Sequence, residues 1–400
     1  MTRISTANTY DVAVDNLVKR QNDLSRSQQQ LSTGKRVVRA SDDPTAASRA
    51  ERALASVSRI DASKRAVDAS QALMSQTESS LGDAGELLQQ ARELLVAAGN
   101  GSYSDAERKS LADQLRGIRD QLLSVANRSD GSDGYLFGGQ GSNQPPFLDA
   151  PGGVQFRGTG GQTQVAGNDE LPLTLDGGAT WLAARTGNGV FETRAITSTG
   201  TAWIDVGGVS NPAALTGSTY SLQFSVSGAG ATTYSVLKDG LATAQTNVSY
   251  VSGQAISVDG MSVTIAGAPA TGDQFELRPS TSTLSVFDTL DKAVTDLSTG
   301  NRSATQVAQT NVMNLRNIDQ VMSRLQAARS GVGETLNRID GVNNRLDGLK
   351  LQGETERSSA EDLDMVQAIS DFQNKQSGYD AALKSYSMVQ RLSLFQYINT

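Results

Sequence analysis

The 400-residue chain contains no cysteine and no histidine, and only 5% of its residues are aromatic. Without cysteine it has neither a disulfide nor a thiolate nucleophile. Without histidine it lacks the commonest general base, and with both residues missing most types of zinc site are absent. Carboxylates, serine, lysine and tyrosine remain as raw material for catalysis. The composition therefore favours a structural or binding protein, and we expect no catalytic residue, no cofactor site and no metal site.

Two further absences limit the possible partners. The net charge is −7, with no excess of positive charge to attract phosphates, which argues against sequence-independent nucleic-acid binding. The longest purely apolar run, around residues 94–98, is far shorter than the roughly 20 residues of a membrane span. The first residues, MTRISTANTYDVAV, lack the apolar region of a cleaved signal peptide. We expect no nucleic acid and no membrane as partner, and any export to proceed without signal cleavage.

The segment LSTGKRVVRASDDPTAA, residues 31–47, has some features of a phosphate-binding loop. Such a loop requires G-x-x-x-x-G-K-[ST], so that backbone N–H groups surround the phosphates and a hydroxyl reaches magnesium. Here Arg36 follows Gly34 and Lys35, and Gln29 stands where the first glycine is needed. The segment therefore does not predict a nucleotide site.

The same segment carries the signals of one helix ending and another beginning. Gly34 follows a column of apolar residues, at a place where glycine commonly ends a helix. Asp43 is a suitable N-cap, and Pro44 at the first helical position loses nothing by lacking an N–H. We interpret residues 32–43 as a connection between two helices.

Apolar residues recur every seven positions in the first third of the chain, which predicts coiled-coil helices. The first helix is marked by Tyr10, Leu17, Leu24 and Leu31. A second column follows a large-and-small pattern typical of closely packed helices, and its large members are Ile60, Val67, Met74, Leu81, Leu88 and Leu95. Ser104 and Glu107 predict a capping box at the start of a third helix.

The heptad pattern returns from residue 311 in the last third of the chain. The polar stretch KLQGETERSSAED, residues 350–362, interrupts it and predicts a break in the helix. A last helix is expected from Leu363, with apolar positions at Met365, Ile369, Phe372, Tyr379, Leu383 and Tyr386.

Between these arms the composition changes. Residues 149–283 contain only 15 charged side chains and are rich in Gly, Thr and Ser. Alternating apolar positions, such as those of residues 220–226 and 261–265, replace the heptad and predict strands. Asp259 and Gly260 between two such runs predict a two-residue hairpin turn. This part is interpreted as an inserted β-domain.

The predicted fold class is therefore mainly α with an inserted β-domain, in which the N- and C-terminal arms pair as long antiparallel coiled-coil helices. The predicted domains are a terminal tier with its joint (1–43 and 350–400), a helical rod (44–148 and 284–349) and the surface-exposed insert (149–283). The joint itself would consist of residues 32–43 and 350–362.

The terminal helices carry more apolar surface than one partner helix can cover. Beyond its heptad set the last helix contains Val366, Val389, Leu392, Leu394, Phe395, Tyr397 and Ile398. Leaving such residues in water forgoes several kcal/mol at about 25 cal/mol per Å², and exposed apolar surface promotes association. A dimeric coiled coil or a packed bundle end would explain this. The alternative is that the ends become ordered only among neighbouring subunits.

Several segments resemble the flagellin family. QQQLSTGKRVVRASDDPTAASRA (28–50) is similar to the family's N-terminal signature. Within that family, SDGSDGYLFGG (129–139) and YDAALKSYSMVQRLSLFQYIN (379–399) resemble the hook–filament junction proteins, and VDGMSVTIAGAPATGDQFELRPS (258–280) resembles a hairpin of hook-associated proteins. The resemblance covers both helical arms, about 1–145 and 285–400, and is weak across most of the insert.

The resemblance implies a structural component of the bacterial flagellum, secreted unfolded through the type III export channel, and no enzyme. It implies a ring of copies joining the hook, through hook-associated protein 1, to flagellin, and an export chaperone on the C-terminal helix. The assembly interface would consist of Tyr10, Leu17, Leu24, Leu31, Ile369, Phe372, Tyr379, Leu383, Tyr386, Leu392, Leu394 and Phe395. The joint would use Gly34, Lys35, Arg36, Arg39, Asp42, Asp43 and Pro44, with the basic residues facing Glu354, Glu356, Glu361 and Asp362.

Three alternatives remain open at this point. The same helices would serve a flagellin, the bulk filament subunit. A signalling coiled coil is a second alternative, although no membrane span supports it. The third is an enzyme within the insert, whose candidate carboxylates are Asp169, Glu170, Asp273 and Glu276, although adjacent acidic residues in glycine-rich loops usually form turns.

Overall fold

The computed structural model describes residues 6–165 and 170–398, and the side chains of residues 10–165 and 170–388. The chain divides into two compact units, one of residues 1–65 with 342–400 and one of residues 66–341. Unit 1 contains the two terminal helices and the connections that link each of them to the neighbouring long helix. Unit 2 contains a helical bundle and the β-domain.

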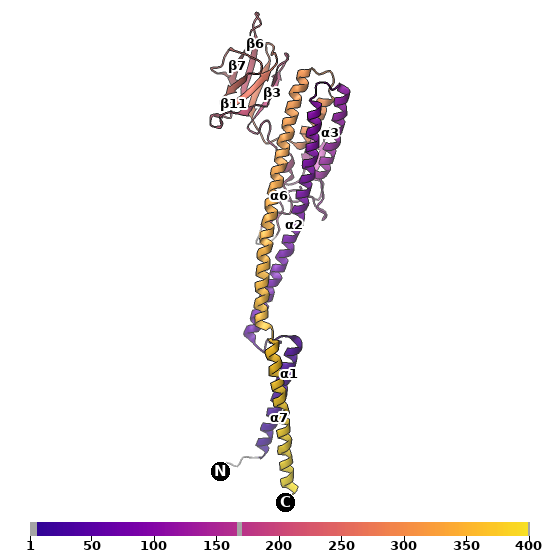
Figure 1. Cartoon of the computed structure of the whole chain (residues 1–400), viewed down its shortest axis with the longest axis vertical. Coiled ribbons are helices and arrows are strands. Elements are labelled where there is room, and N and C mark those ends of the chain that lie inside the picture. Colours follow the sequence, from indigo (N-terminus) through magenta and orange to yellow (C-terminus); the bar gives the residue numbers. More distant parts are fainter. Residues whose placement is uncertain (1–5, 166–169, 399–400) are drawn as a thin grey trace. The chain divides into compact units, whose positions relative to one another are not determined.

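The two terminal helices of unit 1 lie side by side and antiparallel. Figure 1 shows α1 (Thr6–Thr33) next to α7 (Met365–Ile398). The rings of Tyr10 and Tyr386 are 5.8 Å apart, and the Lys375 ammonium donates to the Ser27 hydroxyl at 2.7 Å. The predicted pairing of the N- and C-terminal arms is therefore confirmed.

Two long helices continue from the terminal pair: α2 (Pro44–Ala98) and α6 (Ala304–Glu361). The predicted helix break over 350–362 is wrong, because α6 continues to Glu361 and the chain leaves the helix only at residues 362–364. The stretch has a single large apolar residue, the exposed Leu351, but contains good helix formers and no proline. Gly353 and Ala360 are buried within it, so small residues have replaced the large heptad positions.

The helical bundle of unit 2 is built around the predicted heptad column of α2. Met74, Leu81, Leu88 and Leu95 are almost completely buried, and Ala84, Ala91 and Ala98 lie between them with no exposed surface. Two shorter helices complete the bundle, α3 (Asp105–Ala126) and α5 (Val286–Ser298). Ser104 and Glu107 form the predicted capping box at the start of α3. The sequence did not separate α5 from α6, although Ser285 caps α5.

A small structure of mixed type joins the bundle to the β-domain. It contains β1 (Phe147–Ala150) and β2 (Gly153–Phe156), paired as a hairpin, and the short helix α4 (Gly177–Trp181). Their aromatic side chains pack on α5: the ring of Phe287 is 5.8 Å from Phe147 and 6.0 Å from Trp181. Residues 147–165 and 170–184 thus pack with the helices, whereas the sequence placed nearly all of them in the insert.

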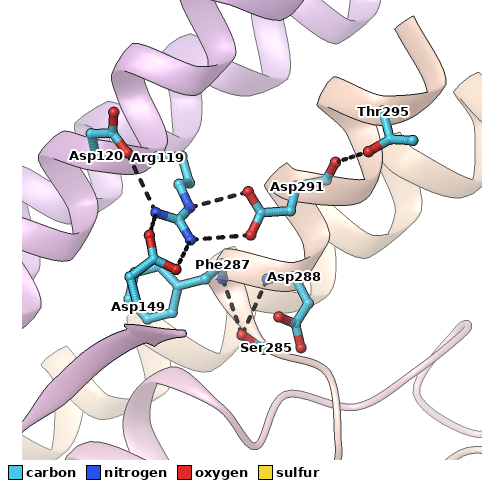
Figure 2. A network of polar contacts seen from close by, with 8 residues as sticks. All are labelled: Arg119, Asp120, Asp149, Ser285, Phe287, Asp288, Asp291 and Thr295. Carbon is cyan, nitrogen blue, oxygen red and sulfur yellow. Dashed lines mark hydrogen bonds and ion pairs between the residues drawn. The ribbon is translucent and has the colours of Figure 1, made fainter. Parts of the chain in front are cut away.

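A buried arginine ties the hairpin to two helices (Figure 2). The guanidinium of Arg119 on α3 makes a two-pronged contact with the carboxylate of Asp149 on β1. Its Nε also lies 3.1 Å from Asp291 of α5. Because these carboxylates stabilise the cation, they raise the pKa of Arg119, with the hydrogen bond to Asp149 as the largest cause. One side chain therefore joins α3, β1 and α5.

Residues 191–279 form the β-domain, with two antiparallel sheets around one core. The larger sheet has the order β3-β12-β6-β7-β8, with β9 also on β7, and the smaller has the order β10-β11-β4, with β5 also on β11. The strands are β3 (Phe191–Thr197), β4 (Trp203–Ile204), β5 (Gly208–Val209), β6 (Tyr220–Val226), β7 (Thr232–Lys238), β8 (Leu241–Ala242), β9 (Val248–Ser249), β10 (Ala255–Val258), β11 (Met261–Ala266) and β12 (Gln274–Pro279). A 3₁₀ turn, η1 (Pro212–Ala214), lies between β5 and β6.

The predicted hairpin turn is confirmed. Val258 pairs with Met261 across Asp259 and Gly260, which have φ values of 38° and 80°. Positive φ at both central positions matches the twist of the flanking strands. The alternation that predicted β6 and β11 is also present, since Leu222, Phe224 and Val263 are buried in the shared core.

Candidate assembly interface

The seam between α1 and α7 is shallow. Leu17, Leu24 and Leu31 of α1 are only half-buried, as are Phe372 and Tyr379 of α7. Among the side chains that the structure describes on these two helices, Ser27 is the one buried residue. The described part of the pair, side chains 10–33 and 365–388, therefore has no dry core of the kind that stabilises most helical proteins.

The outer face of the same pair carries exposed apolar side chains. Val366 is 83% exposed and Met388 60% exposed, and Val12 and Val18 of α1 are about half exposed. Ile369 and Leu383 belong to this face, because they are exposed although the sequence grouped them with the seam. Tyr10 is half exposed even though it touches Tyr386. Each of these apolar side chains is therefore largely exposed to water in the single chain.

The remaining predicted interface residues, Leu392, Leu394 and Phe395, lie on α7 but their side chains are outside the described residues. The assignment of all twelve residues to an interface between subunits stays a prediction. The structure adds Val12 and Val18 as exposed apolar candidates, and Val366, which the sequence already named beyond the heptad set, is the most exposed of the three. The sequence signal for Val12 and Val18 was weak because they fall outside the heptad column.

The joint begins where α1 ends. Gly34 has a φ of 69°, and its N–H donates to Gln30 O at 2.9 Å, as expected of a glycine that ends a helix. Its carbonyl accepts the N–H of Leu363 at 3.0 Å, and Lys35 and Asp362 form an isolated antiparallel bridge. The two connections of unit 1 are therefore held together by backbone hydrogen bonds, not only by charge.

Arg36 connects the end of one helix with the beginning of another. Its Nη2 donates to the carbonyl of Ala360 in the last turn of α6 at 2.8 Å, where the helix dipole favours a cation. Its Nη1 lies 3.2 Å from the carboxylate of Asp43. Its backbone N–H donates to Glu361 O at 2.7 Å. These contacts fix the end of α6 against the start of α2.

Asp43 caps α2 as predicted, with Pro44 as the first helical residue. Its Oδ1 accepts the N–H of Ala46 at 3.0 Å and the Thr45 hydroxyl at 2.8 Å. These hydrogen bonds, and then the Arg36 guanidinium, lower the pKa of Asp43 to about 2. The aspartate therefore remains charged throughout the neutral and mildly acidic range.

The predicted charge pairing across the joint is present only in part. Lys35 pairs with Glu361 at 3.1 Å. Arg39 makes no ion pair within the described ranges; its backbone N–H donates to the side chain of Asp42 in a local turn. Glu356 lines a groove together with Arg36 and with arginines of α2, and Arg39 is not among the residues that line it.

The carboxylates that the sequence offered for an enzyme do not form one site. Asp169 lies outside the described residues, and Glu170 provides its backbone carbonyl to Arg338. Asp273 is fully buried and accepts backbone N–H groups from Thr199, Gly200 and Ala270. Glu276 pairs with Arg194. Asp273 and Glu276 are thus engaged in structural contacts within the β-domain.

The described residues, 6–165 and 170–398, contain neither a membrane-spanning helix nor a metal-site cluster. No helix there is long and apolar enough to cross a bilayer. No cluster of three or more acidic residues in that part of the chain has the arrangement of a metal site.

Both helical arms match known families. Residues 4–142 match the bacterial flagellin N-terminal helical region, and residues 315–398 match the bacterial flagellin C-terminal helical region. Together with the paired terminal helices and the inserted β-domain, these matches define the class as a flagellin-type protein.

Relatives of known structure narrow the class further. The chain resembles FlgL of Xanthomonas campestris, with 31% identity and a TM-score of 0.67 over 76% of this chain and 99% of that chain. It resembles hook-associated protein 3 of Legionella pneumophila, with 25% identity and a TM-score of 0.71 over 76% and 97%. Flagellar hook-associated protein 3 of Salmonella typhimurium is 30% identical over 190 residues, 48% of this chain and 57% of that protein. This chain belongs to the flagellar hook-associated protein 3 (FlgL) family.

Proposed function

We propose that this chain is the junction adaptor of a bacterial flagellum, joining the hook, through hook-associated protein 1, to the flagellin filament. The observation that carries the proposal is the likeness to FlgL at 31% identity over 99% of that chain. The match to the curated relatives spans only a little more than half of their length, so the function is transferred as a proposal.

The terminal pair supports an assembly role. Its seam is only partly buried, and apolar side chains are exposed on both helices, among them Val12 and Val18 on α1 and Val366 and Met388 on α7. Such a pair gains most of its stability when neighbouring subunits cover those side chains. We propose that α1 and α7 become fully ordered on incorporation and form the inner tier of the junction.

Two further features support proposals on export and on chaperone binding: the absence of cysteine and the exposed apolar residues of α7. A chain without cysteine can pass through a narrow channel unfolded without disulfides to reduce. In the cytoplasm the apolar residues of α7 would otherwise promote aggregation. We propose that an export chaperone covers this helix before secretion, that the protein acts outside the cell in the flagellum, and that it is not an enzyme.

Seeded growth of purified protein tests the proposal. Purified chain is added to hooks that end in hook-associated protein 1, and the length of the added layer is measured by electron microscopy. An adaptor adds a short layer and stops, and flagellin then grows from that layer. Continued growth of a long polymer from the pure chain would instead identify the flagellin alternative, which the two matched flagellin regions keep open. No addition to the hook would reject both.

A further inference from the structure

Four polar side chains of α6 hold the backbone of the inserted segment. They are Gln309, Arg316, Arg324 and Arg338, and their partners in the same order are backbone groups of Ile204, Gly187, Ala179 and Glu170. The four positions follow one another by seven, eight and fourteen residues, so they share one face of the helix. Because the partners run in the opposite direction, the chain from Glu170 to Ile204 lies antiparallel along this face.

The contact of Arg324 belongs to a firmly packed part of unit 2. Its Nε donates at 2.8 Å to the carbonyl of Ala179 in α4, and Trp181 of the same short helix is completely buried and stacks on Phe287. This part of the insert is therefore fixed to the bundle. The contacts of Gln309 and Arg316 differ, because their partners lie in the β-domain and in the segment that leads into it.

The β-domain has a core of its own. The apolar cluster at its centre consists of buried side chains between Phe191 and Leu277, and among the described residues no member of it comes from α6. Domains that keep separate cores and meet through mainly polar contacts usually move relative to one another. The β-domain is therefore a module docked on α6, and not an extension of the core of the bundle.

Gln309 takes the place of a neighbouring strand. Strand β4 is the edge of the smaller sheet, and the N–H of Asp205, just after it, donates to Thr264 of β11. Ile204 faces the other way: its N–H donates to Gln309 Oε1 at 2.8 Å, and its carbonyl accepts Gln309 Nε2 at 3.2 Å. A side-chain amide offers the same donor and acceptor as a peptide group. One glutamine thus closes the sheet edge at Ile204, and both residues are buried.

The contact of Arg316 carries a cost of its own. Its Nε donates to the carbonyl of Gly187 at 2.5 Å, and within the described ranges its guanidinium forms no ion pair. The side chain is partly buried, and this burial lowers the pKa of Arg316. Removing a cation from water costs free energy, which a hydrogen bond to one neutral carbonyl offsets only in part. The docked arrangement is therefore favoured by a small margin.

The chain enters and leaves the β-domain through a stalk of two segments, residues 184–190 and 280–284. Ala184 and Leu284 exchange backbone hydrogen bonds of 3.0 and 2.9 Å. Gly187 and Gly189 lie within the first segment and have φ values of 62° and 85°. Hinges between domains are commonly a few loop residues that absorb changes in backbone angles. The stalk has this character.

We propose that the β-domain is a latched module: Gln309 and Arg316 hold it against α6, and when both contacts open it moves about the stalk with its own sheets intact. Water then satisfies the freed backbone groups of Ile204 and Gly187, so opening leaves no buried polar group without a partner. A module of this kind changes its position without disturbing the helices that carry it. The inference goes beyond the proposed function and does not depend on it, because the latch lies within one chain.

Hydrogen exchange at two neighbouring amides tests the latch. The Ile204 amide exchanges when its bond to Gln309 opens, whereas the Asp205 amide, bonded to β11, exchanges when the sheet itself opens. In the full chain we expect Gln309→Ala/Arg316→Ala to accelerate exchange at Ile204 by about tenfold or more and to change it at Asp205 by less than about twofold. Gln326→Ala, at an exposed position of the same helix, is the matched control and should change neither rate.

Distances between spin labels show the motion itself. The chain has no cysteine, so labels attach only where cysteines are introduced. Labels at Leu241→Cys and Ser330→Cys span the β-domain and α6, and labels at Leu241→Cys and Val251→Cys report the β-domain alone; all three positions are exposed. Gln309→Ala/Arg316→Ala should broaden the first distance distribution and leave the second unchanged.

Two kinds of result would overturn the inference. In the first, the double variant keeps the slow exchange of Ile204, or the distribution between Leu241 and Ser330 is as narrow as in the unaltered chain. In the second, Asp205 or the distance within the β-domain changes to the same extent, since the domain would then unfold instead of moving as a module. None of these measurements involves assembly, so their outcome is independent of the seeded-growth test of the proposed function.

Discussion

The terminal pair of unit 1 and the helical bundle of unit 2 follow the same heptad rule, yet they bury their apolar residues very differently. Leu81, Leu88 and Leu95 of α2 are almost completely buried. Leu17 and Leu24, with the same spacing on α1, are only half-buried. The difference lies in the number of partners: the bundle surrounds its column with several elements, whereas α1 and α7 have only each other. A heptad pattern therefore predicts a helix that needs partners, but not whether those partners are in the same chain.

Removing the end of α7 should affect assembly strongly and leave the fold of unit 2 unchanged, and it is expected to have the largest effect of the changes considered. We expect deletion of residues 380–400 to abolish incorporation at the hook, because it removes the C-terminal part of α7 with the exposed Leu383 and Met388. The bundle should remain folded. Both tryptophans, Trp181 and Trp203, lie in unit 2, so their fluorescence reports its thermal unfolding separately. Normal incorporation of the truncated chain would show that the C-terminal helix has no assembly role.

Equivalent leucine truncations measure the difference in burial. Leu88→Ala should lower the free energy of unfolding of unit 2 by about 2–5 kcal/mol, since it leaves a cavity in a closed core. Leu24→Ala should cost the isolated chain about 1 kcal/mol or less, because that side chain is only partly buried and leaves no closed cavity. Urea unfolding followed by tryptophan fluorescence and by circular dichroism gives both values. Equal costs at the two positions would contradict the description of α1 and α7 as an open pair.

The buried arginine of unit 2 provides a polar comparison. Arg119→Met removes the cation that joins α3, β1 and α5, and we expect a loss of about 1–3 kcal/mol. The cost stays below that of a fully buried pair, because Asp149 and Asp291 are each about half exposed and regain water. Arg116→Met, on the exposed face of the same helix, is the matched control and should change stability by less than about 0.5 kcal/mol. A similar loss in both variants would assign the effect to helix α3 itself.

Local rules predicted a good part of these structures. The capping box at Ser104, the cap at Asp43 and the turn at Asp259 each depend on residues a few positions apart, and all three are present. The pairing of the terminal arms followed from the order of heptad segments. It could be predicted because the two halves of the chain mirror each other around the insert.

Other features depend on contacts between distant residues. Phe147, Trp181 and Phe287 meet in one aromatic cluster although they come from three separate segments, and no periodic pattern links them. The continuation of α6 to Glu361 was missed because Gly353 and Ala360 replace large apolar residues at the buried positions. The sequence placed Arg36 in the joint, facing acidic residues of the C-terminal arm, but it did not predict the contacts with Asp43 and with the carbonyl of Ala360.

The smallest expected effect lies at the joint and depends on pH. The pKa of Asp43 is lowered to about 2 by the N–H of Ala46, the Thr45 hydroxyl and Arg36, from an ordinary value of 3.8. A carboxyl whose pKa is lower in the folded state stabilises that state above pH 3.8, and the contribution disappears as the pH falls through about 2. Carbon-13 titration of the Asp43 carboxyl should show this value in the folded chain. Thr45→Val and Arg36→Gln should each move the pKa upward, and a value near 3.8 in the unaltered chain would mean that the joint is open in solution.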